Sequence, residues 1–302
     1  MYKKTGILIL ALTAATVSLA GKLKVVTTTS DLASITEAVA GDLAKVNSIC
    51  SGSQDPHHLQ ARPKYVMMAR SADLWIRTGM ELEIGWEMPV IDGSRNRKIR
   101  PGQPGHLDAS VNIHKLEIPD ASMLTRAMGD VHASGNPHYL TDPENAKHVA
   151  DDIAARLAQL DPKNAETYKA NAKAFSDKID EKMAGWKQKM EPLNGKSIVT
   201  YHKSWIYFCE RFGINIAIEL EPKPGVPPSP THLTQVIQTM EADDIQIILQ
   251  EPWYSTKAAE RVAEKTGARI IEAPIFSGSD PEAQDYISLI DLIVKRLTEQ
   301  PE

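Results

Sequence analysis

Cysteine is scarce in this chain, with only Cys50 and Cys209 among 302 residues. Two thiols so far apart in the sequence exclude the disulfide-rich class of small secreted folds. We interpret each as a buried free thiol, and a single disulfide between them stays open as the alternative. Long apolar runs are also missing beyond the first 20 residues, and a membrane-spanning helix needs about 20 consecutive apolar residues. We therefore expect no membrane insertion of the mature chain.

The chain has fewer positive than negative side chains, with 34 Lys and Arg residues against 39 Asp and Glu residues. If Lys3 and Lys4 leave with a signal peptide, 32 basic residues remain against 39 acidic ones, a net charge near −7. That balance excludes nucleic acid as a partner. The His-Glu-x-x-His motif is absent too, which argues against a zinc hydrolase of that class.

Residues 1–20 predict a signal peptide. Lys3 and Lys4 precede the uncharged run Thr5–Leu19, and the small residues Ser18 and Ala20 suit a signal peptidase. We expect cleavage after Ala20. No cysteine stands at that point to carry a lipid, so the expected product is a soluble, monomeric, periplasmic protein.

The mature chain alternates β-branched segments with segments of helical period. Strands are expected at 22–29, 44–50, 74–78, 198–201, 214–219, 245–250 and 269–271. Helices are expected at 30–40, 63–71, 143–160, 163–190, 205–212, 231–241, 256–266 and 286–298. Glycine and proline break the stretch 92–120 repeatedly, and we expect it to be loop-rich.

This alternation predicts an α/β fold of two similar lobes, each a mainly parallel sheet flanked by helices. One long rigid helix is expected to join the lobes, with a ligand site in the cleft between them. The predicted divisions are a signal peptide at 1–20, an N-terminal lobe at 21–160, a linker helix at 161–192 and a C-terminal lobe at 193–302.

Histidine marks the candidate site. His57 lies in the loop after the second expected strand, within Asp55-Pro56-His57-His58, and His138 also follows a proline. His202 directly follows the strand 198–201. Ligands bind open parallel sheets beyond the carboxyl ends of the strands, and imidazole is a common ligand of borderline metals. Taken alone, His57 is equally well interpreted as an exposed loop histidine, and His202 is better interpreted as an ordinary polar loop residue.

Taken together, the segments resemble the solute-binding proteins of zinc and manganese ABC importers. The resemblance rests on Asp55–His57, Asn136–His138, Asp142-Pro143, Tyr201-His202, Tyr207-Phe208, Arg211–Gly213, Glu221–Pro230 and Gln250–Pro252. It implies that His57, His138 and His202 are metal ligands. The family's fourth ligand is usually a carboxylate near the C-terminus, for which Asp285 is the best match. Asp280 is the competitor and Glu251 a weaker candidate.

The sequence departs from zinc-specific members of that family, which often carry a long loop rich in histidine before the second ligand. The corresponding region holds only His106, His114 and His132. We interpret His106 and His114 as solvated loop residues, and Asp130 with His132 as a reduced remnant of such a loop. The roles of His58 and His132 stay open, and we assign none to His148 or His232.

Three imidazoles and a carboxylate would form a closed, tetrahedral site with bonds of about 2.0–2.2 Å, which suits Zn2+. Four protein ligands leave no position to activate water, which favours capture over catalysis. The resemblance implies high-affinity capture of Zn2+ and delivery to an ABC importer permease, with loading by a metallochaperone left open. Mn2+ or Fe2+ on the same scaffold, a secreted zinc hydrolase, and a binding protein for an iron chelate or corrinoid are the alternatives.

Overall fold

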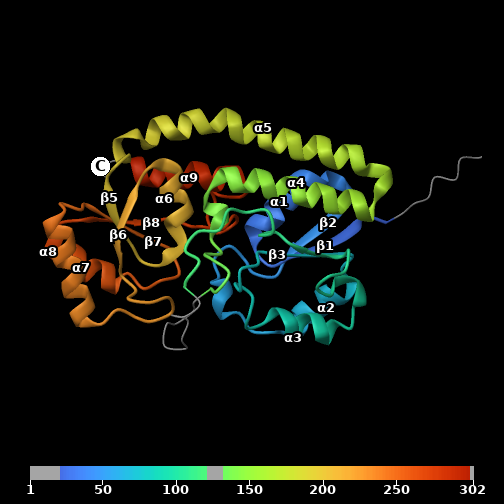
Figure 1. The fold of residues 1–302 in the computed structure, drawn as a ribbon, viewed down its shortest axis with the longest axis horizontal. Coiled ribbons are helices and arrows are strands. Elements are labelled where there is room, and N and C mark those ends of the chain that lie inside the picture. The colour runs from blue at the N-terminus through green and yellow to red at the C-terminus, as the bar shows by residue number, and fades with distance from the viewer. Residues whose placement is uncertain (1–20, 121–131, 300–302) are drawn as a thin grey trace, which may run out of the picture.

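The computed structural model describes residues 21–120 and 132–299. The predicted signal peptide at 1–20 and Asp130 lie outside the described residues. Within the described part, the chain forms two α/β lobes that lie side by side beneath one long helix (Figure 1). No helix in that part of the chain has the length and apolar character needed to span a membrane.

The N-terminal lobe is built on a four-stranded parallel sheet of order β2-β1-β3-β4. Its elements are β1 (Leu23–Thr27), α1 (Ser30–Ala40), β2 (Ala44–Ser48), α2 (Pro63–Ser71), β3 (Leu74–Arg77), α3 (Glu87–Ser94), β4 (His106–Asp108) and α4 (Pro143–Leu160). The central strands are apolar and buried, as expected of a parallel sheet covered on both faces.

The C-terminal lobe repeats this construction with a parallel sheet of order β6-β5-β7-β8. Its elements are β5 (Ser197–Thr200), α6 (Ile206–Phe212), β6 (Asn215–Glu219), α7 (Pro230–Ala242), β7 (Ile247–Gln250), α8 (Lys257–Thr266), β8 (Arg269–Glu272) and α9 (Tyr286–Thr298). The two similar parallel-sheet lobes predicted from the sequence are therefore confirmed.

The long helix α5 (Ala165–Met190) runs along both lobes (Figure 1). Apolar residues spaced by three and four place one buried stripe on it, from Tyr168 to Met190. That stripe packs against α4 and α9, and Trp186 donates a hydrogen bond of 2.8 Å to Asp291 on α9. The apolar core is continuous from the first lobe through this layer to the second, so α5 is a packed brace between the lobes.

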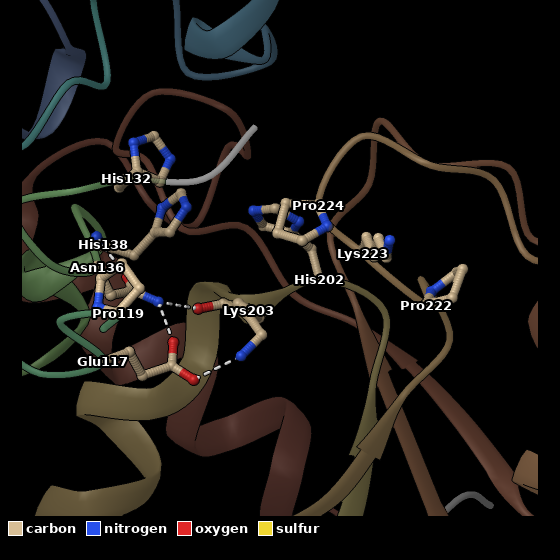
Figure 2. A pocket seen from close by; sticks show the side chains of 10 residues that line it. All are labelled: Glu117, Pro119, His132, Asn136, His138, His202, Lys203, Pro222, Lys223 and Pro224. Atoms are coloured by element: carbon tan, nitrogen blue, oxygen red, sulfur yellow. Dashed lines mark hydrogen bonds and ion pairs between the residues drawn. The ribbon is translucent and has the colours of Figure 1, made fainter. Parts of the chain in front are cut away.

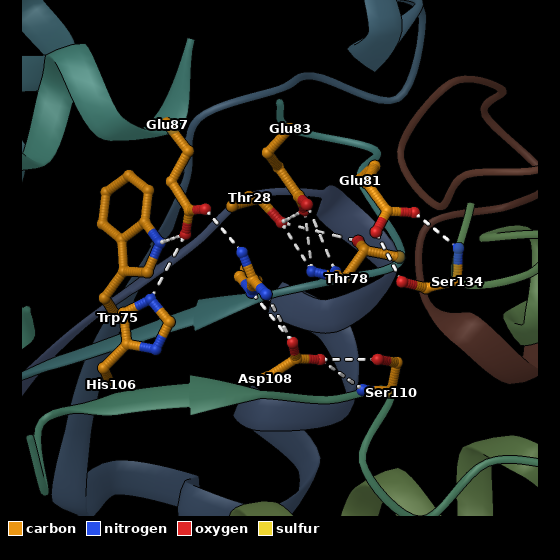
Figure 3. A network of polar contacts seen from close by, with 12 residues as sticks. Thr28, Trp75, Thr78, Glu81, Glu83, Glu87, His106, Asp108, Ser110 and Ser134 are labelled. Carbon is orange, nitrogen blue, oxygen red and sulfur yellow. Dashed lines mark hydrogen bonds and ion pairs between the residues drawn. The ribbon is translucent and has the colours of Figure 1, made fainter. Parts of the chain in front are cut away.

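The segment 92–120 is more ordered than the expected loop, because β4 pairs in parallel with β3 there. His106 is buried on this strand rather than solvated, which corrects the sequence-based interpretation. Its ring lies 3.3 Å from Glu87, whose carboxylate also accepts bonds from Trp75 and Arg77 (Figure 3). These hydrogen-bonding partners offset the cost of burying the polar ring. The burial depends on tertiary contacts, which the local sequence does not show.

Both cysteines are buried free thiols, as expected. Burial raises the pKa of Cys50 and of Cys209 to about 12. Thiols with so high a pKa are protonated and unreactive at neutral pH.

Candidate metal centre

Three histidines predicted to be ligands converge between the lobes. His57, His138 and His202 each offer one ring nitrogen, and these nitrogens all lie within 4.8 Å of one another. The centroids of the three rings are 5.3–5.5 Å apart. Figure 2 shows His138 and His202 approaching the same space from different lobes. A triangle of imidazole nitrogens of this size can accept a single metal ion at its centre.

His57 is aimed by the turn that carries it. Asp55 caps the short 3-10 turn Pro56–His58 by accepting bonds from the backbone N–H of His57, at 2.9 Å, and from its Nδ1, at 2.8 Å. Trp86 donates a bond of 2.9 Å to the carbonyl of Pro56. Burial raises the pKa of Asp55, but the bonds and charge of His57 outweigh burial and leave that pKa lowered. With Nδ1 held as a donor, the Nε2 lone pair of His57 faces the centre.

His202 is aimed in the same way from the other lobe. It follows β5, and its Nδ1 lies 2.7 Å from a carboxylate oxygen of Glu221. The backbone N–H of Glu221 donates to the carbonyl of Tyr201 at 3.0 Å, which fixes the carboxylate beside the ring. Pairs of carboxylate and histidine of this kind orient metal ligands and make them more basic.

His138 combines deep burial, a ring nitrogen without a hydrogen-bond partner and a strongly lowered pKa. It is almost fully buried, and no described residue bonds to its Nε2. Burial, and then the neighbouring His202 and His57, hold its pKa well below the usual range of histidine, so the ring is neutral at pH 7. A buried nitrogen without a partner is costly in a protein interior. A metal ion at the centre of the triangle would satisfy it.

A fourth imidazole lies beside His57 and lines the same hollow as His138 and His202, although it is not in the group of nitrogens within 4.8 Å of one another. His132 lies 3.2 Å from His57 between their Nε2 atoms, with ring centroids 5.2 Å apart. Burial, followed by the charges of His57 and His202, lowers the pKa of His132 to about 3. From the sequence we interpret His132 as part of a reduced histidine-rich loop with its role left open, and its place beside His57 is not predicted.

The carboxylates considered as fourth ligand do not reach the histidines. Asp285 caps α9, accepting the backbone N–H of Ser288 at 2.8 Å, and lines a separate hollow with residues of α1 and α5. Asp280 forms an ion pair with Arg296. Glu251 is fully buried, but within the described residues the ligand group contains the three histidines and no carboxylate. Asp285, the expected fourth ligand, therefore serves as the N-cap of α9 through its Oδ1.

The remaining histidines lie elsewhere. The side chain of His58 is 65% exposed and lies 3.7 Å from Asp55. His114 and His148 are exposed. His232 lies 2.9 Å from the carbonyl of Glu219 through its Nε2.

Polar contacts close one side of the centre and join the lobes. The side-chain amide of Asn136 donates to the carbonyl of Lys203 at 2.7 Å and to Glu117 at 2.9 Å, and Lys203 pairs with Glu117 at 2.7 Å (Figure 2). Arg211 donates two bonds of 2.8 Å to Asp142 at the start of α4. His138 and His202 therefore lie on segments fixed to each other.

The fold and the centre define a two-lobed binding protein with a metal-ligating cluster between its lobes. Residues 25–300 match the family described as "ZnuA: Zinc-uptake complex component A periplasmic". The chain belongs to this family.

Curated relatives carry the names of metal-binding proteins. The "Iron-binding protein YfeA" of Yersinia pestis is 28% identical over 91% of this chain and 85% of its own length. The "Manganese ABC transporter substrate-binding lipoprotein PsaA" of Streptococcus pneumoniae is 26% identical over 92% of this chain and 89% of its own.

Solved structures share the fold. The "Crystal structure of ZnuA" superposes with a TM-score of 0.76 at 23% identity, covering 92% of this chain and 98% of that one. The Mn-bound periplasmic metal binding protein of Candidatus Liberibacter asiaticus gives 0.75 at 24% identity, with the same coverage. The two lobes and the bracing helix are thus features of the family.

Proposed function

We propose that this protein captures a divalent transition metal, Zn2+ first, in the periplasm and hands it to the permease of an ABC importer. The observation that carries the proposal is the convergence of His57, His138 and His202 from two lobes within 4.8 Å. The names of the relatives, which include a manganese transporter protein and an iron-binding protein, support metal transport and keep Mn2+ and Fe2+ as alternatives.

The chemistry of the centre favours zinc among these metals. Imidazole nitrogens suit zinc, whereas manganese prefers carboxylate, carbonyl and water oxygens. The two carboxylates nearest the rings, Asp55 and Glu221, act on Nδ1 of His57 and His202 and so support nitrogen ligation. The hollow beside the histidines holds about 230 Å³, less than the roughly 300–1,000 Å³ of typical sites for organic ligands. A bare ion fits this space better than a chelate or a corrinoid.

Elemental analysis and calorimetric titration of the purified protein test the proposal. We expect one zinc ion per chain, weaker binding of Mn2+, and a loss of zinc affinity of more than about 100-fold in His138→Ala, since loss of an outer partner alone costs about 10–100-fold. His114→Ala, which removes an exposed histidine, is the matched control. Absence of stoichiometric metal binding by the wild-type protein would refute the proposal.

Export is tested separately. We propose that residues 1–20 are removed during export, so the N-terminus of protein from the periplasmic fraction should be Gly21. A retained Met1 would contradict this.

A further inference from the structure

His132 and His57 lie at a separation that zinc coordination produces. Their Nε2 atoms are 3.2 Å apart. Two nitrogens that each bind a tetrahedral zinc ion at about 2.0–2.1 Å lie about 3.3–3.4 Å from each other. The distance therefore matches that between two ligands of one zinc ion, and His132 lines the same hollow as His138 and His202.

The segment that carries His132 is held in place from the N-terminal lobe. Glu81 accepts the backbone N–H of Ser134, at 3.0 Å, and its hydroxyl (Figure 3). Glu81 belongs to a tight turn in which Met80 and Glu81 have φ values of 49° and 60°, a left-handed conformation that costs energy for residues other than glycine. The turn thus fixes the segment that places the imidazole of His132 against that of His57.

From this geometry we propose that His132 is the fourth ligand, so that the ion is held by four imidazoles. The inference rests on the proposed function and adds a residue to that site. It replaces the expected carboxylate by a neutral nitrogen, and the charge of the ion is then balanced from outside the ligand set by Asp55 and Glu221. Because every ligand is nitrogen, the site discriminates against Mn2+, which prefers oxygen.

The plain rival is a hydrogen bond between two neutral rings, in which His132 donates Nε2–H to His57 and takes no part in binding. X-ray absorption spectroscopy of the zinc-loaded wild-type protein separates the two without any substitution. We expect four imidazole ligands at about 2.0–2.1 Å. Three imidazoles with one oxygen ligand would overturn the inference.

A variant provides the second test. We expect His132→Ala to weaken zinc binding by at least about 10-fold, because water replaces an imidazole, and to reduce the preference for Zn2+ over Mn2+. His114→Ala is the control, and thermal unfolding of the metal-free proteins checks that both variants fold. The visible spectrum of bound Co2+ should differ between wild type and His132→Ala.

The outcomes distinguish this inference from the proposed function. If His132→Ala keeps the wild-type zinc affinity and Co2+ spectrum while His138→Ala loses binding, the fourth-ligand assignment is wrong and metal capture stands. If the wild-type protein binds no metal, the proposed function fails as well.

Discussion

Substitution of Glu251 by glutamine should stabilise the metal-free protein, and more so as the pH rises. Glu251 is fully buried, and among the described residues neither of its carboxylate oxygens has a hydrogen-bond partner. Burial raises its pKa to about 8, and the charges of Glu221 and Asp55 contribute in the same direction. The folded protein therefore favours the protonated acid, which glutamine resembles in shape and charge.

The sign and size follow from this pKa. A carboxyl whose pKa is raised on folding contributes stability below its unfolded value of 4.5, and this contribution is lost as the pH rises towards 8. Since one pKa step corresponds to about 1.4 kcal/mol, the wild-type protein loses on the order of 3 kcal/mol between pH 4.5 and pH 7 through this group. Glu251→Gln removes this loss of stability at neutral and higher pH. At low pH, where the wild-type carboxyl is protonated, the substitution changes the stability little.

Urea unfolding of chelator-treated protein at pH 5 and pH 8 measures the effect. We expect a small difference between Glu251→Gln and wild type at pH 5 and a gain of a few kcal/mol for the variant at pH 8. Glu264→Gln removes an exposed carboxylate and serves as the control for loss of charge. An equal difference at both pH values would show that Glu251 is not protonated in the folded protein, and the reasoning would fail.

Three further predictions concern the centre and the contacts between the lobes. Asp55→Asn should weaken zinc binding by about 10–100-fold in calorimetry, because the amide no longer anchors the Nδ1–H of His57 as a charged acceptor; unchanged affinity would contradict this. Arg211→Met should lower the free energy of unfolding by about 1–3 kcal/mol, since it leaves the buried carboxylate of Asp142 without its cationic partner; an unchanged urea midpoint would count against it. Small-angle scattering should give the same radius of gyration with and without zinc, because the lobes share one continuous core; a large change would refute a fixed interlobe geometry.

Much of the fold could be predicted from the sequence because local signals agreed with the packing. The bounds of α1, α2, α4 and α9 are the expected ones, each helix beginning at or directly after a residue suited to a helix N-terminus. The prediction missed α3 and β4. Helix α3 contains a proline and a glycine, and β4 has three residues whose strand conformation depends on pairing with β3.

The centre was less predictable than the fold. His202 follows β5, His138 precedes α4 and His57 lies in the loop after β2, and the topology brings those positions together. Asp285 also precedes a helix, but an aspartate there can serve equally as an N-cap, and only the tertiary structure shows that it does. His132 lies in a stretch of sequence without helical or strand period, and its segment is held through Ser134 by Glu81, a residue distant in the sequence.

Release of the ion should begin at the His132 segment rather than by separation of the lobes. Opening the lobes breaks reciprocal hydrogen bonds between Ser30 and Ser277, at 2.7 and 2.9 Å, and divides a continuous apolar core. Among the described residues, the segment of His132 is held to the N-terminal lobe by the two bonds from Ser134 to Glu81.

Glu81→Gln should therefore speed the dissociation of zinc several-fold, because bonds to a charged acceptor are stronger than those to a neutral one. Stopped-flow mixing with a chelator measures the rate, and thermal unfolding of the metal-free variant checks that its stability stays close to that of the wild type. Glu264→Gln again controls for charge. A dissociation rate equal to that of the wild type would mean that the hold of Glu81 on this segment does not limit release, and that the ion leaves by another movement.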